Sequence, residues 1–298
     1  MKDNNKKIIL YLGGGGMAGI FGAGVANALE EADLYSRIKA VYTASAGAFN
    51  AAFFLTKQTK LGARIYYEKL TSRFINPVNI LPRILQCICY KKIFKKNKRI
   101  NSNAIDINYL IGMVKKKLDK TKLKKQKIPL YVKLLDLKTN KIKYFDIRKY
   151  NVFKLLEIAA NILPYYFSKQ KINGKLYIDA CIKEPVGLEY LIKKYPNCLI
   201  VSILTLTEYR NKRIEYFKNF LENFMTKSML SGQLSKISFK RQSRLKNINL
   251  VKNNRDILIV SPSINSKIMP YTTNKSKLMD LYEEGRNKIH KILQFVNK

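Results

Sequence analysis

The feature that most constrains the fold is a short apolar run that stops at four consecutive glycines. Ile8–Leu12 is apolar throughout, and Gly13–Gly16 follow it directly. A short, continuous apolar run bounded by glycine is typical of a buried strand that ends in a tight loop. Gly19–Asp33 then spaces larger apolar side chains among Ala and Gly. This pattern predicts a helix that packs closely on a sheet.

The same succession of strand and helix is repeated at once. Ile38–Thr43 forms a second short strand pattern, Ala44–Gly47 is a sharp turn, and Ala48–Thr56 continues as an Ala- and Phe-rich helix. An order of strand, helix, strand and helix implies a parallel sheet with helices on its faces. The sequence therefore predicts an α/β fold.

The rest of the chain extends this sheet and interrupts it once. Further strands are predicted at Leu130–Asp136, Lys141–Asp146, Leu176–Ile178, Leu199–Leu206 and Ile257–Val260, and helices at Val152–Ile162 and Lys277–Val296. Residues 71–127 are rich in Lys and Asn and contain two prolines, which indicates a basic insertion or lid with one or two helices. We expect a catalytic domain over residues 8–206, with residues 207–298 packed on it as a helical and strand extension.

The charge of the chain is strongly positive. Lys and Arg number 57 against 20 Asp and Glu, a formal net charge of +37. Such a field attracts anionic lipid headgroups or nucleic acid, although an AT-rich genome also produces a composition rich in Lys, Asn and Ile. No apolar run approaches the roughly 20 residues of a membrane span, and Ile8–Leu12 is too short for a signal peptide. We expect a cytoplasmic protein, or one that binds anionic membranes peripherally.

The glycine loop is compatible with three kinds of structure. Gly14–Gly19 matches G-x-G-x-x-G, but a dinucleotide-binding fold also needs an acid at the end of its second strand, and Tyr42–Ser45 has none. A P-loop is excluded because Ile20 and Phe21 follow the last glycine. Consecutive glycine N–H groups beside a helix N-terminus suit an oxyanion hole. A simple tight turn is the third interpretation.

Ser45 lies where the second strand passes abruptly into a helix. A nucleophile elbow needs small neighbours because its turn is strained, and Ala44, Ala46 and Gly47 meet that need, with Thr43 in place of the usual first glycine. The alternative is a serine that caps the following helix. The glycine loop upstream favours the nucleophile, since the carboxyl ends of neighbouring parallel strands converge on one edge of the sheet.

A nucleophilic serine needs a base, and the chain offers two candidates. Its single histidine, His290, lies just off the apolar face of the last predicted helix and is expected to be a solvated or rim residue. Asp179 ends a short strand and precedes the small Ala180, so its carboxylate is placed to accept a serine proton directly. The alternative for Asp179 is an ordinary turn residue.

Taken together, these segments resemble the patatin-like phospholipases. That family has a strand, a G-G-G-x-[RK]-G loop, a helix, then G-x-S-x-G, and later D-G-[GA]. The corresponding segments are Gly14–Gly19, Thr43–Gly47 and Asp179–Cys181, with departures at Ala18, Thr43 and Ala180. The resemblance covers nearly the whole chain apart from the basic insertion, and implies a three-layer sandwich with a mainly parallel central sheet and helices on both faces.

The resemblance also implies a function. Ser45 would be the nucleophile and Asp179 the general base of a dyad that cleaves fatty-acyl esters of phospholipids or other lipids. Gly14, Gly15, Gly16 and Met17 would form the oxyanion hole, supported by Gly19, Thr43, Gly47 and Ala180. No metal or cofactor is implied, and no nucleic-acid-binding motif is present. The alternative function is a weakly active or inactive relative that binds anionic membranes.

Overall fold

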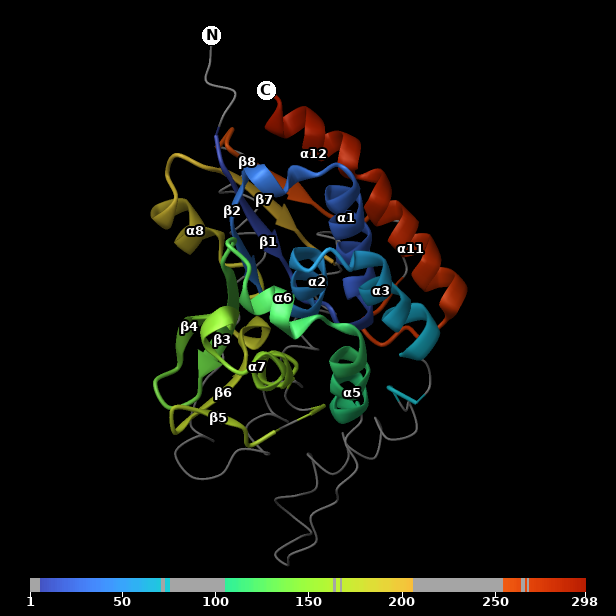
Figure 1. Cartoon of the computed structure of the whole chain (residues 1–298), viewed down its shortest axis with the longest axis vertical. Helices are drawn as coiled ribbons and strands as arrows, with labels where there is room; N and C mark the ends of the chain where they lie inside the picture. Colours follow the sequence, from blue (N-terminus) through green and yellow to red (C-terminus); the bar gives the residue numbers. More distant parts are fainter. Residues whose placement is uncertain are drawn as a thin grey trace, which may run out of the picture.

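The computed structural model describes residues 6–70, 73–75, 105–162, 165–166, 168–205, 254–263, 266 and 268–298. Within them a mixed, eight-stranded sheet forms the middle layer (Figure 1). Its strands are β1 (Ile8–Leu12), β2 (Ile38–Thr43), β3 (Leu130–Asp136), β4 (Lys141–Asp146), β5 (Lys171–Ile172), β6 (Lys175–Asp179), β7 (Leu199–Ile203) and β8 (Ile257–Val260).

The core of the sheet is parallel. The spatial order is β5-β6-β3-β2-β1-β7-β8, with β4 also paired to β3. The pairs β1–β2, β1–β7, β2–β3 and β7–β8 are parallel, whereas β4, β5 and β6 pair in antiparallel fashion. The predicted α/β fold with a mainly parallel central sheet is therefore confirmed.

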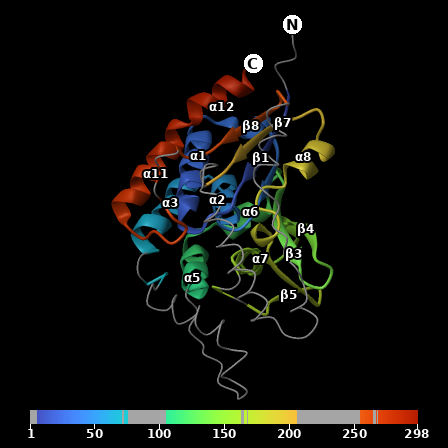
Figure 2. The same cartoon turned by 180° about the vertical axis from the view of Figure 1, so that it is seen from behind.

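Helices cover both faces of the sheet (Figures 1 and 2). They are α1 (Ile20–Glu31), α2 (Ala46–Leu55), α3 (Thr59–Arg64), α5 (Ile107–Lys117), α6 (Lys120–Lys124), α7 (Val152–Ala159), α8 (Leu188–Lys194), α11 (Lys275–Asn287) and α12 (Ile289–Val296). Strand side chains alternate between faces. Leu10 and Leu12 of β1 join the large core with α1, α2 and α11, while Ile9 and Tyr11 join a smaller core that α8 covers.

The strand β3 brings two distant parts of the chain together. β4 pairs along one edge of it, from Tyr131 to Asp136. The other edge is shared, because β2 pairs with residues 130–132 and β6 pairs with residues 134–136. β2 is parallel to β3 and β6 is antiparallel, so their carboxyl ends run toward each other. The residues that follow Thr43 therefore meet the end of β6 at Asp179.

The structure corrects one helix of the sequence prediction. The single helix predicted over residues 277–296 is interrupted at Lys288, whose N–H bonds three residues back to the Gly285 carbonyl. Residues 76–104 and 206–253 lie outside the described residues, so most of the basic insertion does too. No helix in the described ranges is long and apolar enough to cross a membrane. The division at residue 206 stays a prediction.

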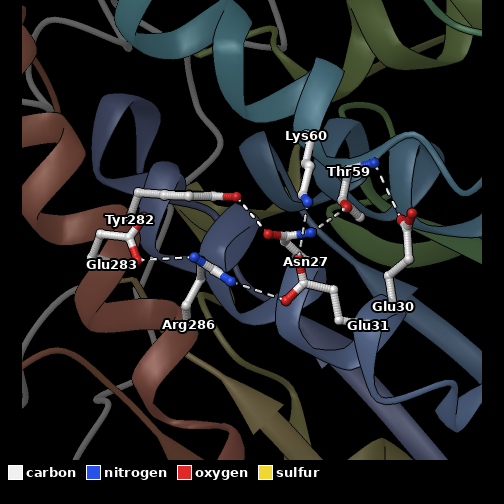
Figure 3. A network of polar contacts seen from close by, with 8 residues as sticks. All are labelled: Asn27, Glu30, Glu31, Thr59, Lys60, Tyr282, Glu283 and Arg286. Carbon is white, nitrogen blue, oxygen red and sulfur yellow. Dashed lines mark hydrogen bonds and ion pairs between the residues drawn. The ribbon is translucent and has the colours of Figure 1, made fainter.

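The last part of the chain packs tightly on α1. A Cβ atom on Gly24 would lie 2.1 Å from the Tyr282 carbonyl oxygen, so the two backbones are nearly in contact. Figure 3 shows the polar network beside this contact. The Tyr282 hydroxyl donates to Asn27 at 2.6 Å, and an Arg286 nitrogen lies 3.0 Å from a Glu31 oxygen. The network holds α11 against the helix that follows the glycine loop.

The contact at Gly24 gives a first prediction. Alanine in place of helical glycine normally stabilises a helix by about 1 kcal/mol. Gly24→Ala should instead lower the free energy of unfolding by at least about 1 kcal/mol, because α1 and α11 must separate. Gly112→Ala in α5 is the matched control, since its Cβ would meet nothing within 4 Å. Urea denaturation followed by circular dichroism measures both. Stabilisation by both substitutions would contradict the close contact.

Candidate functional site

Ser45 occupies a strained turn between β2 and α2. Its backbone angles are φ 52° and ψ −132°, a combination that non-glycine residues adopt only under constraint from their surroundings. The side chain makes no capping hydrogen bond to α2. The alternative interpretation of Ser45 as a helix cap is therefore wrong, and the hydroxyl is available for another partner.

The carboxyl group of Asp179, at the end of β6, lies beside Ser45. Both residues are 3% exposed, and the Ser45 side chain is near enough to lower the pKa of that carboxyl group. The Cys181 N–H donates to Asp179 Oδ1 at 2.9 Å, and the Asp179 N–H donates to the Asn161 carbonyl at 3.2 Å. These two hydrogen bonds fix Asp179. The structure brings together the two residues that the sequence singles out, as the meeting of β2 and β6 requires.

The environment of Asp179 shifts its acidity. Burial raises the pKa of its carboxyl group above the usual value, because a charged carboxylate loses its hydration. Hydrogen bonds from Cys181 and Ser45 and the positive charge of Lys133 act in the opposite direction. The result is a carboxylate that binds a proton more readily than an exposed aspartate does, which is the property a general base needs.

The glycine loop lies directly against Ser45. A Cβ atom on Gly14 would be 2.6 Å from the Ser45 Cβ and 2.9 Å from the Cys181 sulfur. Only glycine fits such a close approach. The backbone of the loop, rather than any of its side chains, therefore faces the serine.

Hydrogen bonds orient the peptide groups of this loop. The Thr205 hydroxyl donates to the Gly14 carbonyl, and the Ala18 N–H donates to the Gly15 carbonyl. In a trans peptide the N–H points opposite to the C=O, so the N–H groups of Gly15 and Gly16 point away from those partners. Among the described residues, no acceptor takes the N–H of Gly14, Gly15 or Gly16.

Met17 is predicted to contribute to the oxyanion hole. Its N–H donates to the Pro270 carbonyl at 2.9 Å, so this donor already has a partner. Pro270 comes from the segment before α11, which no local sequence pattern connects to the loop. The contact is instead set by the packing of α11 on α1.

The other residues of the predicted motifs support the turn at Ser45, the glycine loop and the turn after Asp179. The Thr43 hydroxyl donates to the Tyr131 carbonyl at 3.2 Å, and the Gly47 N–H donates to the Ala44 carbonyl at 3.0 Å. The Gly19 carbonyl accepts a hydrogen bond from the Asn50 side chain at 2.7 Å. Ala180 is fully buried at the start of a short 3-10 turn, Ala180–Ile182.

An apolar pocket opens beside Ser45. Ser45, Gly16 and Met17 contribute to its wall, and the rest is mostly aliphatic and aromatic. The lining side chains come from α2, α5 and the segment after α3, and include Phe49, Phe53, Ile65, Tyr66, Leu70, Ile107, Leu110 and Val114. Besides Ser45, Asn50 and the Tyr66 hydroxyl are polar; the hydroxyl donates to Asn50, which also donates to the Gly19 carbonyl. The pocket therefore suits a long apolar group.

Two residues of the site were missed by sequence reasoning. The Cys181 side chain and the fully buried Lys133 both lower the pKa of the Asp179 carboxyl group. A lysine in the middle of the apolar run 130–135 was the signal for the second. His290, as predicted, is exposed. No cluster of metal-ligating side chains occurs in the part of the chain that the structure describes.

Comparisons with known proteins identify the family of the chain. The sequence model of a family described as patatin-like phospholipase matches residues 10–192. No curated protein sequence matches the chain.

The solved structures that resemble the chain are distant in sequence. One is VipD from Legionella pneumophila, with 13% identity, a TM-score of 0.49, and coverage of 97% of this chain and 67% of that one. Another is the type III effector protein ExoU, with 12% identity, a TM-score of 0.42, and coverage of 98% and 53%. A third is the ExoU–SpcU complex of Pseudomonas aeruginosa, with 13% identity, a TM-score of 0.35, and coverage of 98% and 51%. The chain thus spans two thirds of VipD and about half of ExoU.

The backbone of Ser45 gives a second prediction. If the turn is strained, glycine relieves the strain and alanine retains it. Ser45→Gly should therefore be more stable than Ser45→Ala by about 1 kcal/mol, although both lack the hydroxyl. The two variants are compared by urea denaturation. An alanine variant as stable as the glycine variant would show that residue 45 carries no backbone strain.

Proposed function

The chain belongs to the patatin-like phospholipase family and is a lipid acyl hydrolase, and we propose that it cleaves fatty-acyl esters of lipids with Ser45 as nucleophile and Asp179 as general base. One observation carries the proposal. The strained, uncapped Ser45 lies beside a buried carboxyl group whose pKa its side chain lowers, and a simple structural serine has no need of either feature.

The reaction follows from this geometry in two steps. Asp179 accepts the proton of the Ser45 hydroxyl as its oxygen attacks the ester carbonyl carbon. The tetrahedral intermediate then collapses, the ester C–O bond breaks, and the departing alcohol takes the proton from Asp179. In the second step Asp179 removes a proton from water, which attacks the acyl-serine and releases the fatty acid. Acid and base roles alternate on one carboxyl group, so no histidine is required.

The glycine loop supplies the charge stabilisation that both tetrahedral intermediates need. Fixed N–H donors aimed at a developing oxyanion act more strongly in a buried site than in water. The N–H groups of Gly14, Gly15 and Gly16 lie in the loop that contacts Ser45, and no described acceptor takes them. We assign the oxyanion to these three glycines.

The substrate class follows from the apolar pocket and the charge. The pocket begins at Ser45 and is lined by apolar side chains, which favours a fatty-acyl chain in it. The net charge of +37 favours approach to anionic lipid surfaces, at about 1 kcal/mol for each Lys or Arg near such a surface. We therefore propose a phospholipid or another acyl-ester lipid as substrate, reached at an anionic membrane to which the protein binds peripherally.

The dyad gives a third prediction. Ser45→Ala and Asp179→Asn should each lower kcat/KM for a fatty-acyl ester by at least about 10³-fold, because each removes a reacting group. A fluorophosphonate probe should label the wild-type serine and should not label Ser45→Ala. His290→Ala is the control and should hydrolyse the ester at the wild-type rate. Full activity in Ser45→Ala would refute the proposal. Vesicle binding without labelling of any variant would favour an inactive membrane-binding protein instead.

The acidity of Asp179 gives a fourth prediction. The base must be deprotonated, so activity should be lost as the pH falls through its pKa. Because burial raises that pKa, the acidic limb of kcat/KM should lie above pH 3.8, the ordinary value for aspartate. A pH profile between 4 and 9 measures the limb. A profile flat across this range would contradict Asp179 as the base.

The pocket gives a fifth prediction. Val114 is buried on α5 and lines the pocket, whereas Lys116 on the same helix is exposed. Val114→Trp should lower the ratio of long-chain to short-chain ester hydrolysis by at least about tenfold, because the added ring excludes methylene groups. Lys116→Trp, the matched control, should leave the ratio unchanged. An unchanged ratio in folded Val114→Trp would place the acyl chain elsewhere.

A further inference from the structure

A lysine with no exposed surface lies in the middle of the sheet. Lys133 of β3 is 0% exposed, and burying an ammonium group without partners costs several kcal/mol. Its Nζ lies 2.6 Å from the Glu184 carbonyl oxygen, 3.1 Å from the Val186 carbonyl oxygen and 3.5 Å from Glu184 Oε2. Three acceptors around one nitrogen match the three N–H donors of an ammonium group. Lys133 is therefore fully satisfied in its charged form.

A second buried donor acts on the same segment. The hydroxyl of Tyr11 in β1 donates to the Pro185 carbonyl at 2.8 Å. The carbonyl groups of three consecutive residues, Glu184, Pro185 and Val186, are thus held by side chains from the sheet. We call Lys133 and Tyr11 the carbonyl clamp.

The residues held by the carbonyl clamp, 184–186, follow closely after the proposed base. Asp179 is followed by the 3-10 turn Ala180–Ile182, and the Glu184 N–H donates to the Ala180 carbonyl at 2.8 Å. Between Asp179 and the clamp there are only four residues, and this hydrogen bond closes them into a compact turn. A displacement at Glu184 is therefore transmitted to Ala180 and Asp179.

Lys133 also acts on Asp179 through its charge. The ammonium group lowers the pKa of the buried carboxyl group, against the larger effect of burial. Burial in turn lowers the pKa of Lys133, and Glu184, Cys181 and Asp179 oppose that change. The titratable groups that face this lysine are Asp179, Cys181 and Glu184 from the end of β6 and the residues after it. Tyr144 of β4, which pairs with Lys133, and Tyr11 of β1, whose ring centroid is 5.4 Å from Nζ, face it as well.

We propose that Lys133 is a positioning residue for the Ser45–Asp179 dyad, which fixes the turn after Asp179 and supplies the positive charge that the buried carboxylate requires. This proposal rests on the proposed function of the dyad. In this proposal Lys133 contacts neither the substrate nor the reacting atoms of Ser45 and Asp179. Its effect is carried by the 184–186 carbonyls and by its electric field.

Substitutions that remove or keep the positive charge separate this role from a merely structural one. Lys133→Met removes the positive charge and should move the acidic limb of kcat/KM upward. Lys133→Arg keeps the positive charge and should leave the limb at its wild-type pH. Tyr11→Phe breaks one bond of the clamp without a change of charge and should leave the limb in place. Loss of stability alone would not move the limb in the uncharged variant and spare it in the charged one.

Two results would overturn the proposal. A limb that stays at its wild-type pH in folded Lys133→Met overturns it. If Lys133→Met does not fold, Lys133→Gln decides, and a limb that stays at its wild-type pH in that variant overturns the proposal.

A carboxyl titration separates the proposal from the function on which it rests. If the wild-type protein hydrolyses no ester, the proposed function fails, and the Asp179 carboxyl is titrated instead by ¹³C NMR, with Asp179→Asn for assignment. A higher Asp179 pKa in Lys133→Met than in the wild type supports the electrostatic role of Lys133. An unchanged pKa overturns that role.

Discussion

One edge of β3 is shared by two strands that run toward each other, and the rest of the site depends on this constraint. β2 pairs with residues 130–132 and β6 with residues 134–136, so the gap between them falls at Lys133. Ser45 follows the first strand and Asp179 ends the second. Because a one-residue slip in a strand turns every side chain to the opposite face, these registers decide whether the hydroxyl and the carboxylate meet. The proximity of Ser45 and Asp179 thus depends on strand pairing.

The site combines buried charge with close backbone contact. Asp179 and Lys133 both lose hydration; Asp179 accepts a hydrogen bond from the Cys181 N–H, and Lys133 donates to the Glu184 and Val186 carbonyls. Gly14 lies against Ser45, while the Pro270 carbonyl takes the neighbouring Met17 N–H. The packing of α11 on α1 therefore reaches the glycine loop. Stability far from the serine and geometry beside it are connected through this contact.

The sequence allowed the central fold to be predicted because its signals are local. Short apolar runs stopped by glycine or small residues located β1, β2 and β3, and small residues around Ser45 predicted the turn. Contacts between distant segments were not predictable in this way. The bond between Met17 and Pro270 joins residues more than 250 positions apart, and nothing near either of them signals it. The interruption at Lys288 also follows from packing, since the amphipathic pattern continues through it.

Lys133 shows which part of the site could be predicted from the sequence and which could not. Its place inside an apolar run signalled a buried charge, but its partners are main-chain carbonyls 51 and 53 residues away, which carry no sequence signature. Cys181 is similar, because a thiol beside Asp179 is visible in the sequence while its contact with Gly14 is not. Local chemistry could be predicted for this site, whereas its supporting contacts required the fold.

The account is tested most directly by identifying the residue that carries the acyl group during turnover. The protein is mixed with a short-chain activated ester, quenched in acid within milliseconds and digested with trypsin, and the peptide of residues 40–57 is examined by mass spectrometry. Ser45 is the only serine in that peptide. The account predicts a mass increase of one acyl group on Ser45, which disappears as the substrate is consumed. An acyl group on Cys181 instead, or hydrolysis with no acyl group on Ser45 at any time, would contradict it.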